Sequence, residues 1–423
     1  MKTRNALLVA TTLFLLNTNS STAQTPSPAV NDKQLPGWTD YVDSLRPLGD
    51  RILPVTQFPD NPQSRQETWR ILMQMLAQGV IVHVYDNPDY PEFTPIYSSV
   101  LNLFAPNVDY IYGWTSVRDS GVYRIKGFRG TNRFVDLSFV LGPGQLLGKH
   151  APVLGTLDLD TLNLGPDGAY DVLVSPKRPD GYTGDWFQMP PGTTAVQYRQ
   201  ASYDWLHERD AIITIQRLDV PAPRPRFTAE ELAQRFTDLK NWIETGSLIF
   251  LNRVRDMKAQ GIVNRVAVQD YSAWGGAKDQ TYLEGLYDIR DDEALIVETQ
   301  VPKTCRYWSI LLTDDQFATV DWMNRQSSLN GYQAALDKDG KFRAVIAVKD
   351  PGVPNWLDTG GYRFGGIQMR WNHCSESPIP TTRKVKLSEL RKALPGSTPI
   401  VSASERDASL RLRREGAQSR RRW

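Results

Sequence analysis

The chain has 423 residues, of which 40% are hydrophobic and 23% charged, an ordinary globular composition at a length that allows two or three domains. The formal net charge is +2, and Lys2 and Arg4 near the start supply that excess. Because the rest of the chain is close to neutral, it has no general basic field, which argues against a nucleic-acid-binding protein.

Residues 1–23 have the pattern of a secretory signal peptide. A short basic start precedes an apolar run over residues 6–16, and Ser21-Thr22-Ala23 fits a small-residue cleavage site. A bilayer-spanning helix needs about 20 apolar residues, roughly twice this run, and no later stretch reaches that length. We therefore predict cleavage near Ala23, no transmembrane segment, and a periplasmic or secreted protein.

The next segment predicts one helix. Residues 24–37 are rich in Pro and polar residues, and Ser64 with Glu67 then has the spacing of a capping box. The predicted helix covers residues 64–77, ends at Gly79, and has an apolar stripe of Trp69, Leu72, Met73 and Leu76. Residues 80–85 are rich in β-branched residues and predict a strand or a buried extension, in which we interpret His83 as a core histidine.

Residues 104–220 have a β pattern throughout. Short runs rich in apolar residues are separated by Gly, Pro, Asn and Asp, at 123–125, 133–140, 169–174, 195–199 and 211–218. No helical pattern alternates with them, so a sandwich or barrel is favoured over a parallel α/β sheet.

A linker and a long helix follow. Pro221, Pro223 and Pro225 favour a stiff connection, and Thr228 with Glu231 forms a second capping box. Apolar residues keep helical spacing up to residue 261, although Gly246 leaves open a kink or two shorter helices.

Residues 303–374 carry the densest set of aromatic, Arg, Asn and Asp residues. Strand patterns cover 307–312, 342–348 and 366–371, and Asp339-Gly340 is typical of a tight hairpin turn. Asp350-Pro351-Gly352 predicts an ordered loop after the second strand. The pattern predicts a second β domain with a rigid, aromatic-rimmed loop.

Four features of the first β region recur in the second in the same order, 170–173 residues later. They are Arg133-Phe134 with Arg306-Tyr307, the Asp-Gly turns at 167–168 and 339–340, the Pro to Trp segments 179–186 and 351–356, and Gln197-Tyr198-Arg199 with Gln368-Met369-Arg370. This order predicts two copies of one β unit packed as a pseudo-symmetric pair.

Three strings in the second unit, DWMNRQSSLNGYQ, LDKDGKFRAVIA and DPGVPNWLDTGGYRFGGIQMRW, resemble the family catalogued as domain of unknown function twelve-fourteen, over about residues 265–375. Upstream, APNVDYIYGW and YRIKGFRGTNRFVDLSF resemble the family twelve-fifty-four more loosely. The resemblance implies a β-rich, jelly-roll-like build and supplies no reaction or catalytic residues.

The predicted fold is mainly β with accessory helices, as two tandem jelly-roll-like β-sandwich domains joined by a long helix. The expected divisions are a signal peptide (1–23), a flexible and helical region (24–103), a first sandwich (104–220), a linker with the long helix (221–264), a second sandwich (265–375), and a C-terminal extension with a basic tail (376–423). We expect the tail to be disordered.

Cys305 and Cys374 are the two cysteines of the chain, and in an oxidising compartment they predict a disulfide, with two buried thiols as the alternative. Such a bond would contribute about 4 kcal/mol in the chain-entropy model.

Metal and cofactor motifs are missing. The sequence has no HExxH, CxxC or Gly-x-Ser-x-Gly, and its histidines are scattered at His83, His150, His207 and His373. We therefore predict neither a metal nor an organic cofactor.

The remaining candidates cluster in the second β unit. Flat Trp faces stack on sugars, and Asn, Asp and Arg hydrogen-bond hydroxyl or carboxylate groups. The predicted ligand-binding set is Trp322, Asn324, Arg325, Asn355, Trp356, Asp358, Arg370 and Trp371. Trp356 and Arg370 have repeat counterparts in Trp186 and Arg199, and we interpret such duplicated residues as scaffold.

We expect an exported carbohydrate-binding or small-ligand-binding protein, or an assembly protein of the cell envelope that forms a homo-oligomer. Its partner would be a small molecule or glycan. The alternative is a cofactor-free hydrolase or lyase that uses Asp321 or Asp358 with His373 and Arg325.

Overall fold

The computed structural model describes residues 35–55, 62–142, 152–272 and 275–420. The predicted leader and its cleavage site lie outside these residues. Among the described residues, no helix combines the length and the apolar character that a membrane crossing requires.

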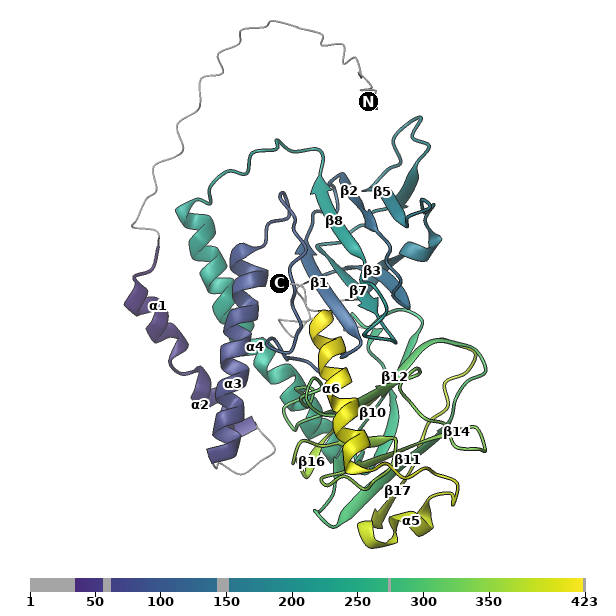
Figure 1. Ribbon diagram of the computed structural model, residues 1–423. Coiled ribbons are helices and arrows are strands. Elements are labelled where there is room, and N and C mark those ends of the chain that lie inside the picture. The colour runs from purple at the N-terminus through teal and green to yellow at the C-terminus, as the bar shows by residue number, and fades with distance from the viewer. Residues whose placement is uncertain (1–34, 56–61, 143–151, 273–274, 421–423) are drawn as a thin grey trace, which may run out of the picture.

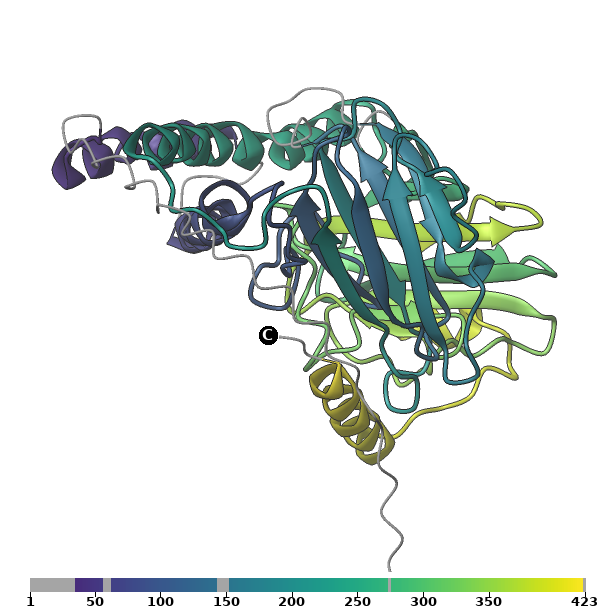
Figure 2. The ribbon, with the colours of Figure 1, turned by 90° about the horizontal axis from the view of Figure 1, so that it is seen from above.

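Helices lie to one side of the sheets (Figures 1 and 2). They are α1 (Trp38–Leu45), α2 (Leu48–Ile52), η2 (Leu53–Val55), α3 (Pro62–Gly79), the π-helix η3 (Val80–Tyr85) and α4 (Ala229–Ala259). α4 begins at the predicted capping box and continues through Gly246. α3 packs closely on α4. Gly79 is so near Leu239 and Trp242 that a Cβ at this position would collide with both.

The predicted stripe of α3 is partly wrong. Trp69 and Met73 are 58% and 59% exposed, whereas Ile71, Leu72 and Met75 are buried. Apolar residues occur on more than one face of this helix, so its spacing alone did not determine which face meets α4.

His83 belongs to the π-helix η3, which stands where a strand or a buried extension was predicted, and its ring lies 5.8 Å from that of Trp242. Burial lowers the pKa of His83 to about 4. The interpretation as a histidine satisfied within the core is therefore confirmed only in its packing, because His83 is partly buried and its Nε2 has no hydrogen-bond partner among the described residues.

The first sandwich contains two sheets of four strands, ordered β1-β7-β3-β4 and β6-β5-β2-β8. Their facing sides form one apolar core that includes Tyr123, Leu137, Phe139 and Val172. The strands are β1 (Tyr110–Ser116), β2 (Tyr123–Phe128), β3 (Phe134–Val140), β4 (Val153–Asp158), β5 (Ala169–Ser175), β6 (Asp185–Gln188), β7 (Ala195–Ala201) and β8 (Ile212–Arg217), with η5 (Leu159–Thr161) after β4.

The second sandwich repeats this arrangement with the orders β10-β16-β12-β13 and β15-β14-β11-β17. Its strands are β10 (Gln280–Asp288), β11 (Glu293–Gln300), β12 (Cys305–Thr313), β13 (Ser328–Asn330), β14 (Lys341–Ala347), β15 (Trp356–Asp358), β16 (Phe364–Cys374) and β17 (Thr381–Lys386). β9 (Arg265–Gln269) lies against β10. In each sandwich one pair is parallel, β5 with β6 and β14 with β15. The mainly β fold and the internal repeat are confirmed, while the exact domain limits stay a prediction.

The two copies meet through equivalent residues. Phe134 and Tyr307 occupy the same place in the repeat, and their rings lie 5.7 Å apart. The neighbouring equivalent pair is also in contact, since Nε of Arg133 donates to the carbonyl oxygen of Arg306. Contact between equivalent positions is the mark of a two-fold interface, so the sandwiches are related by a pseudo-two-fold axis at this junction.

Cys305 and Cys374 form the predicted disulfide. They are register partners on the neighbouring strands β12 and β16. The bond therefore closes one end of the sheet that meets the first sandwich.

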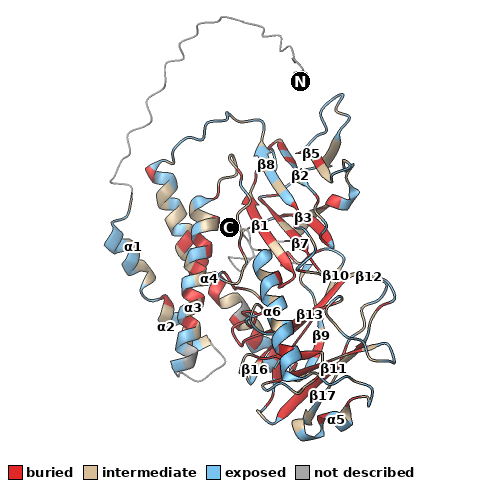
Figure 3. Ribbon diagram, in the orientation of Figure 1, coloured by how far each residue is buried: buried red, intermediate tan, exposed pale blue. Residues whose placement is uncertain are grey.

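The expected disordered tail is wrong. After η7 (Leu387–Glu389) and α5 (Leu390–Ala393), residues Ala403–Ser419 form helix α6, which begins at a capping box of Ser402 and Glu405. α6 lies along both sandwiches (Figure 1), and Figure 3 shows the buried residues along the strands beneath it. Buried arginines hold both ends of the helix. Arg406 in the first turn pairs with Asp350 at 2.9 Å, and Arg420, directly after the last turn, donates to the backbone carbonyl oxygen of Asp109.

Candidate functional site

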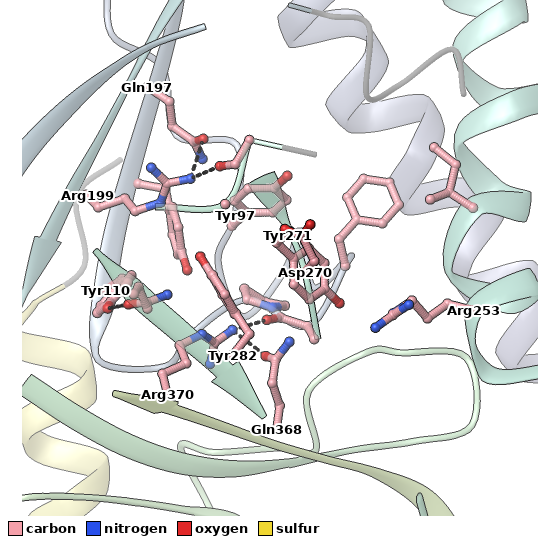
Figure 4. Close-up of a pocket in the computed structure, with 18 of the residues that line it drawn as sticks. Tyr97, Tyr110, Gln197, Arg199, Arg253, Asp270, Tyr271, Tyr282, Gln368 and Arg370 are labelled. Atoms are coloured by element: carbon pink, nitrogen blue, oxygen red, sulfur yellow. Dashed lines mark hydrogen bonds between the residues drawn. The ribbon is translucent and has the colours of Figure 1, made fainter. Parts of the chain in front are cut away.

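A cavity of about 410 Å³ lies between the two sandwiches and α4 (Figure 4). Strands β7 and β16 each contribute a Gln-x-Arg pair, Gln197 with Arg199 and Gln368 with Arg370. Six aromatic rings complete much of the wall, from Tyr97, Phe104, Tyr110, Tyr112, Tyr271 and Tyr282.

Arg199 is 7% exposed and hydrogen-bonds neutral groups. Its Nη1 donates to Ser138 at 2.8 Å, and its Nη2 donates to Gln197 at 3.0 Å and to the carbonyl oxygen of Gly275 at 2.9 Å. Nε donates to no described residue, so the guanidinium keeps unused donors.

Arg370 is 5% exposed and has even fewer partners. Its Nη2 donates to Gln368 and, at 3.3 Å, to the carbonyl oxygen of Ala105, and its buried Nη1 has no partner among the described residues. No carboxylate in the described part of the chain forms an ion pair with Arg199 or Arg370. Asp136 acts on Arg199 electrostatically without forming an ion pair, and the groups that act on Arg370 are tyrosines. A buried cation without an ion pair is costly, so this pair of arginines is an exception that requires a reason.

The third arginine of the wall is neutralised. Arg253 pairs with Glu284 at 3.0 Å and donates to Gln269. Glu284 also accepts from Tyr271 and Gln368, both at 2.6 Å. This network positions Gln368 against Arg370 and cancels the charge of Arg253.

The tyrosines add further donors. The hydroxyl of Tyr112 accepts from the backbone of Asn107 at 3.0 Å, that of Tyr282 accepts from the backbone of Ala277 at 2.8 Å, and neither donates to a described residue. Burial raises the pKa of Tyr97 and of Tyr112, which keeps their hydroxyls protonated. The hydroxyls of Tyr112 and Tyr282 are therefore free to donate to a ligand.

Asp136 is the register partner of Arg199 on β3, and it is 8% exposed. Burial raises the pKa of Asp136 to about 6, although the charge of Arg199 opposes the shift. No described residue hydrogen-bonds its Oδ1. The carboxyl group is therefore desolvated and not held by an ion pair.

Asp136→Asn is expected to stabilise the protein at pH 7.5 and not at pH 4. Since the folded pKa lies above the unfolded value, the contribution of Asp136 to stability is full at low pH and is lost as the pH rises through about 6. Asparagine lacks that loss, so denaturant unfolding should show a gain on the order of 2 kcal/mol at pH 7.5. Asp171→Asn, at an exposed carboxylate paired with Arg124, is the control; equal pH profiles for wild type and Asp136→Asn contradict the prediction.

A second cavity, of about 250 Å³, contains three of the predicted residues, Asp321, Trp322 and Arg325. Arg325 pairs with Asp358 at 3.0 Å. Asp321 accepts from the backbone of Met323 and from backbone and side chain of Asn324, so it orders its own turn.

Other predicted residues have structural roles. Asn355 bridges backbone groups of Ala335 and Arg343, and Trp356 is buried, with its indole bonded to the carbonyl oxygen of Ala347. Trp371 lies in the core of the second sandwich, and Trp322 packs with Val108 and Trp205.

His373 does not join Arg325 and Asp358. It is the next-to-last residue of β16, whereas Asp358 and Arg325 lie beside the loop that leads into the first residue of that strand. Nine residues of strand separate these ends, which corresponds to about 30 Å. Of the predicted set, only Arg370 lies in the larger cavity.

Arg199, Tyr112 and Tyr282 were not among the predicted site residues. The repeated Gln-x-Arg was recognised in the sequence, but duplication was interpreted as a sign of scaffold. The structure places both copies in one cavity, which is formed at the pseudo-two-fold junction.

Comparison with known proteins finds a family match within the second half. Residues 287–370 match DUF1214, a family of proteins of unknown function. The DUF1214 region spans β11 to most of β16 and ends at Arg370 itself, which confirms the resemblance in the second half. The relation of the first half to twelve-fifty-four stays a prediction.

The fold is similar to that of an uncharacterised protein from Burkholderia cenocepacia, with a TM-score of 0.77 and 28% identity over 83% of this chain and 97% of the other. A protein from Vibrio parahaemolyticus, VPA0106, aligns with a TM-score of 0.43 and 11% identity over 75% of this chain and 98% of the other. No curated protein matches the chain. DUF1214 is described as of unknown function and the Burkholderia cenocepacia protein as uncharacterised, so the proposal below rests on the chemistry of the cavity.

Proposed function

We propose that this protein binds a small organic acid in the cavity between its two sandwiches. The observation that carries the proposal is the pair Arg199 and Arg370, two buried guanidinium groups without a carboxylate partner among the described residues. An acidic group supplies the missing counter-charge and accepts from the unused N–H donors. The volume of about 410 Å³ lies within the usual range for small-molecule sites.

A neutral sugar suits the cavity less well, because it leaves both cationic groups uncompensated. Of the tryptophans predicted to stack on a glycan, Trp356 and Trp371 are buried in apolar clusters, and Trp322 contributes to the wall of the second cavity and not to this one. Of the two ligand classes expected from the sequence, a small molecule is therefore favoured over a glycan.

The enzymatic alternative has less support. Arg325 and Asp358 neutralise each other, Asp321 is occupied by its own turn, and His373 lies near the other end of β16. A cofactor-free hydrolase or lyase needs an acid and a base that converge on one point, and these residues do not.

Export to the periplasm or exterior is the second part of the proposal. The leader pattern of residues 1–23 supports it, and so does the disulfide between Cys305 and Cys374, because such bonds persist in oxidising compartments.

The binding test is isothermal titration of the purified protein with carboxylic acids, inorganic phosphate and neutral sugars, alongside thermal shift. We expect acids to bind and raise the melting temperature, and Arg370→Gln to weaken acid binding more than tenfold, since loss of one partner of a buried charge pair costs about 2–5 kcal/mol. Arg124→Gln, an exposed arginine on β2, is the matched control. Binding of sugars but not acids, or unchanged acid binding by Arg370→Gln with a native melting curve, overturns the proposal.

A further inference from the structure

The two arginines are equivalent residues of the repeat. Arg199 lies on β7 and Arg370 on β16, strands that occupy the same second place in sheets of matching order. Each donates through Nη2 to the glutamine two residues earlier on its own strand. Each half therefore contributes an equivalent Gln-x-Arg pair to one cavity. The junction between the halves also brings other equivalent residues into contact.

One cluster of tyrosines lies between the two Gln-x-Arg pairs. Tyr110, Tyr112 and Tyr282 act electrostatically on both guanidinium groups, and the centre of the Arg370 guanidinium is 5.8 Å from the centre of the Tyr282 ring. In the view of Figure 4, Tyr110 and Tyr282 are drawn between Arg199 and Arg370. The hydroxyl of Tyr110 also donates to Gln280, which joins β1 of one half to β10 of the other.

The charges of the cavity do not cancel. Arg253 is balanced by Glu284, and Asp256 pairs with its neighbour Arg255. Asp270 is exposed and accepts from the backbone of Ser272. Neither Arg199 nor Arg370 has an ion-pair partner among the described residues, although Asp136 acts electrostatically on Arg199. One acidic group would therefore satisfy the free donors of only one of the two arginines.

We propose that the ligand carries two acidic groups, one for each Gln-x-Arg pair, on a small apolar or aromatic body that contacts the tyrosine rings. This inference rests on the proposed function and specifies its ligand class. Each carboxylate accepts from the free N–H groups of one arginine, and the hydroxyls of Tyr112 and Tyr282 supply further donors along the body.

The experiment compares matched acids by isothermal titration against the intact protein. Straight-chain dicarboxylates from succinate to suberate are paired with monocarboxylates of the same length, and terephthalate is paired with benzoate. We expect the best diacid to bind at least tenfold more tightly than its monoacid. Arg199→Gln and Arg370→Gln should each reduce that diacid to the affinity of the monoacid, with Arg124→Gln as the control.

Other outcomes separate this inference from the proposed function. If monoacids bind as tightly as diacids and Arg370→Gln weakens the binding of both, the cavity binds acids, but the inference that the ligand carries two acidic groups is wrong. If inorganic phosphate or sulfate binds more tightly than every diacid, one compact anion is shared by both arginines and the inference is again overturned. If no acid binds, both proposals fail.

Discussion

Asp109→Ala is expected to lower the free energy of unfolding by at least about 3 kcal/mol, because it leaves several buried donors without an acceptor. Asp109 precedes β1 and is 1% exposed. Its carboxylate accepts from Trp205 at 2.8 Å, from Asn330 at 2.8 Å and from the hydroxyl of Tyr307 at 2.6 Å. Trp205 belongs to the first half of the chain and the other two to the second, so one side chain joins both sandwiches.

Asp109→Asn is the matched control, since it keeps the shape and one carbonyl acceptor, and Tyr307 retains a second bond to Asn107. We expect it to cost about 1 kcal/mol, the typical contribution of one hydrogen bond. Denaturant titration followed by tryptophan fluorescence and circular dichroism measures both variants. Equal stability of Asp109→Ala and wild type would show that the junction is held by other contacts.

Replacing both cysteines with alanine is expected to lower the free energy of unfolding by about 4 kcal/mol in the chain-entropy model. Cys305 and Cys374 are 69 residues apart, so their bond removes much of the freedom of the unfolded chain between them. The measurement is denaturant unfolding without reductant, repeated for wild type with reductant. Reductant should lower the stability of wild type toward that of the variant and leave the variant unchanged; a variant as stable as oxidised wild type contradicts the prediction.

Local features of the fold were predictable because short-range rules determine them. The strand pattern at residues 342–348 predicted β14, whose Phe342, Ala344 and Ile346 are fully enclosed. Gly340 has a φ of 77°, as the Asp-Gly turn requires. Thr228 and Glu231 predicted the start of α4. The repeat was recognisable because the two copies still share residues at equivalent positions.

The cavity could not be predicted in the same way, since it depends on how the two sandwiches dock. Arg199 and Arg370 are recognisable as a repeated pair, but no local pattern shows that both lie in one cavity. α6 was missed for a related reason. In the sequence its arginines look like those of a solvated tail. Their partners, Asp350 for Arg406 and the backbone of Asp109 for Arg420, are distant in the sequence and are brought close only by the fold.

Two copies of one sandwich that face each other across a shared axis have the geometry of a symmetric dimer whose subunits have become one polypeptide. Such a fusion frees each half to evolve separately, which identical subunits cannot do. The halves have already diverged beside the arginines, because Asp136 is the register partner of Arg199 and Ser309 is that of Arg370. One end of the cavity is therefore electrically different from the other, and a molecule with unlike ends would bind in one orientation only.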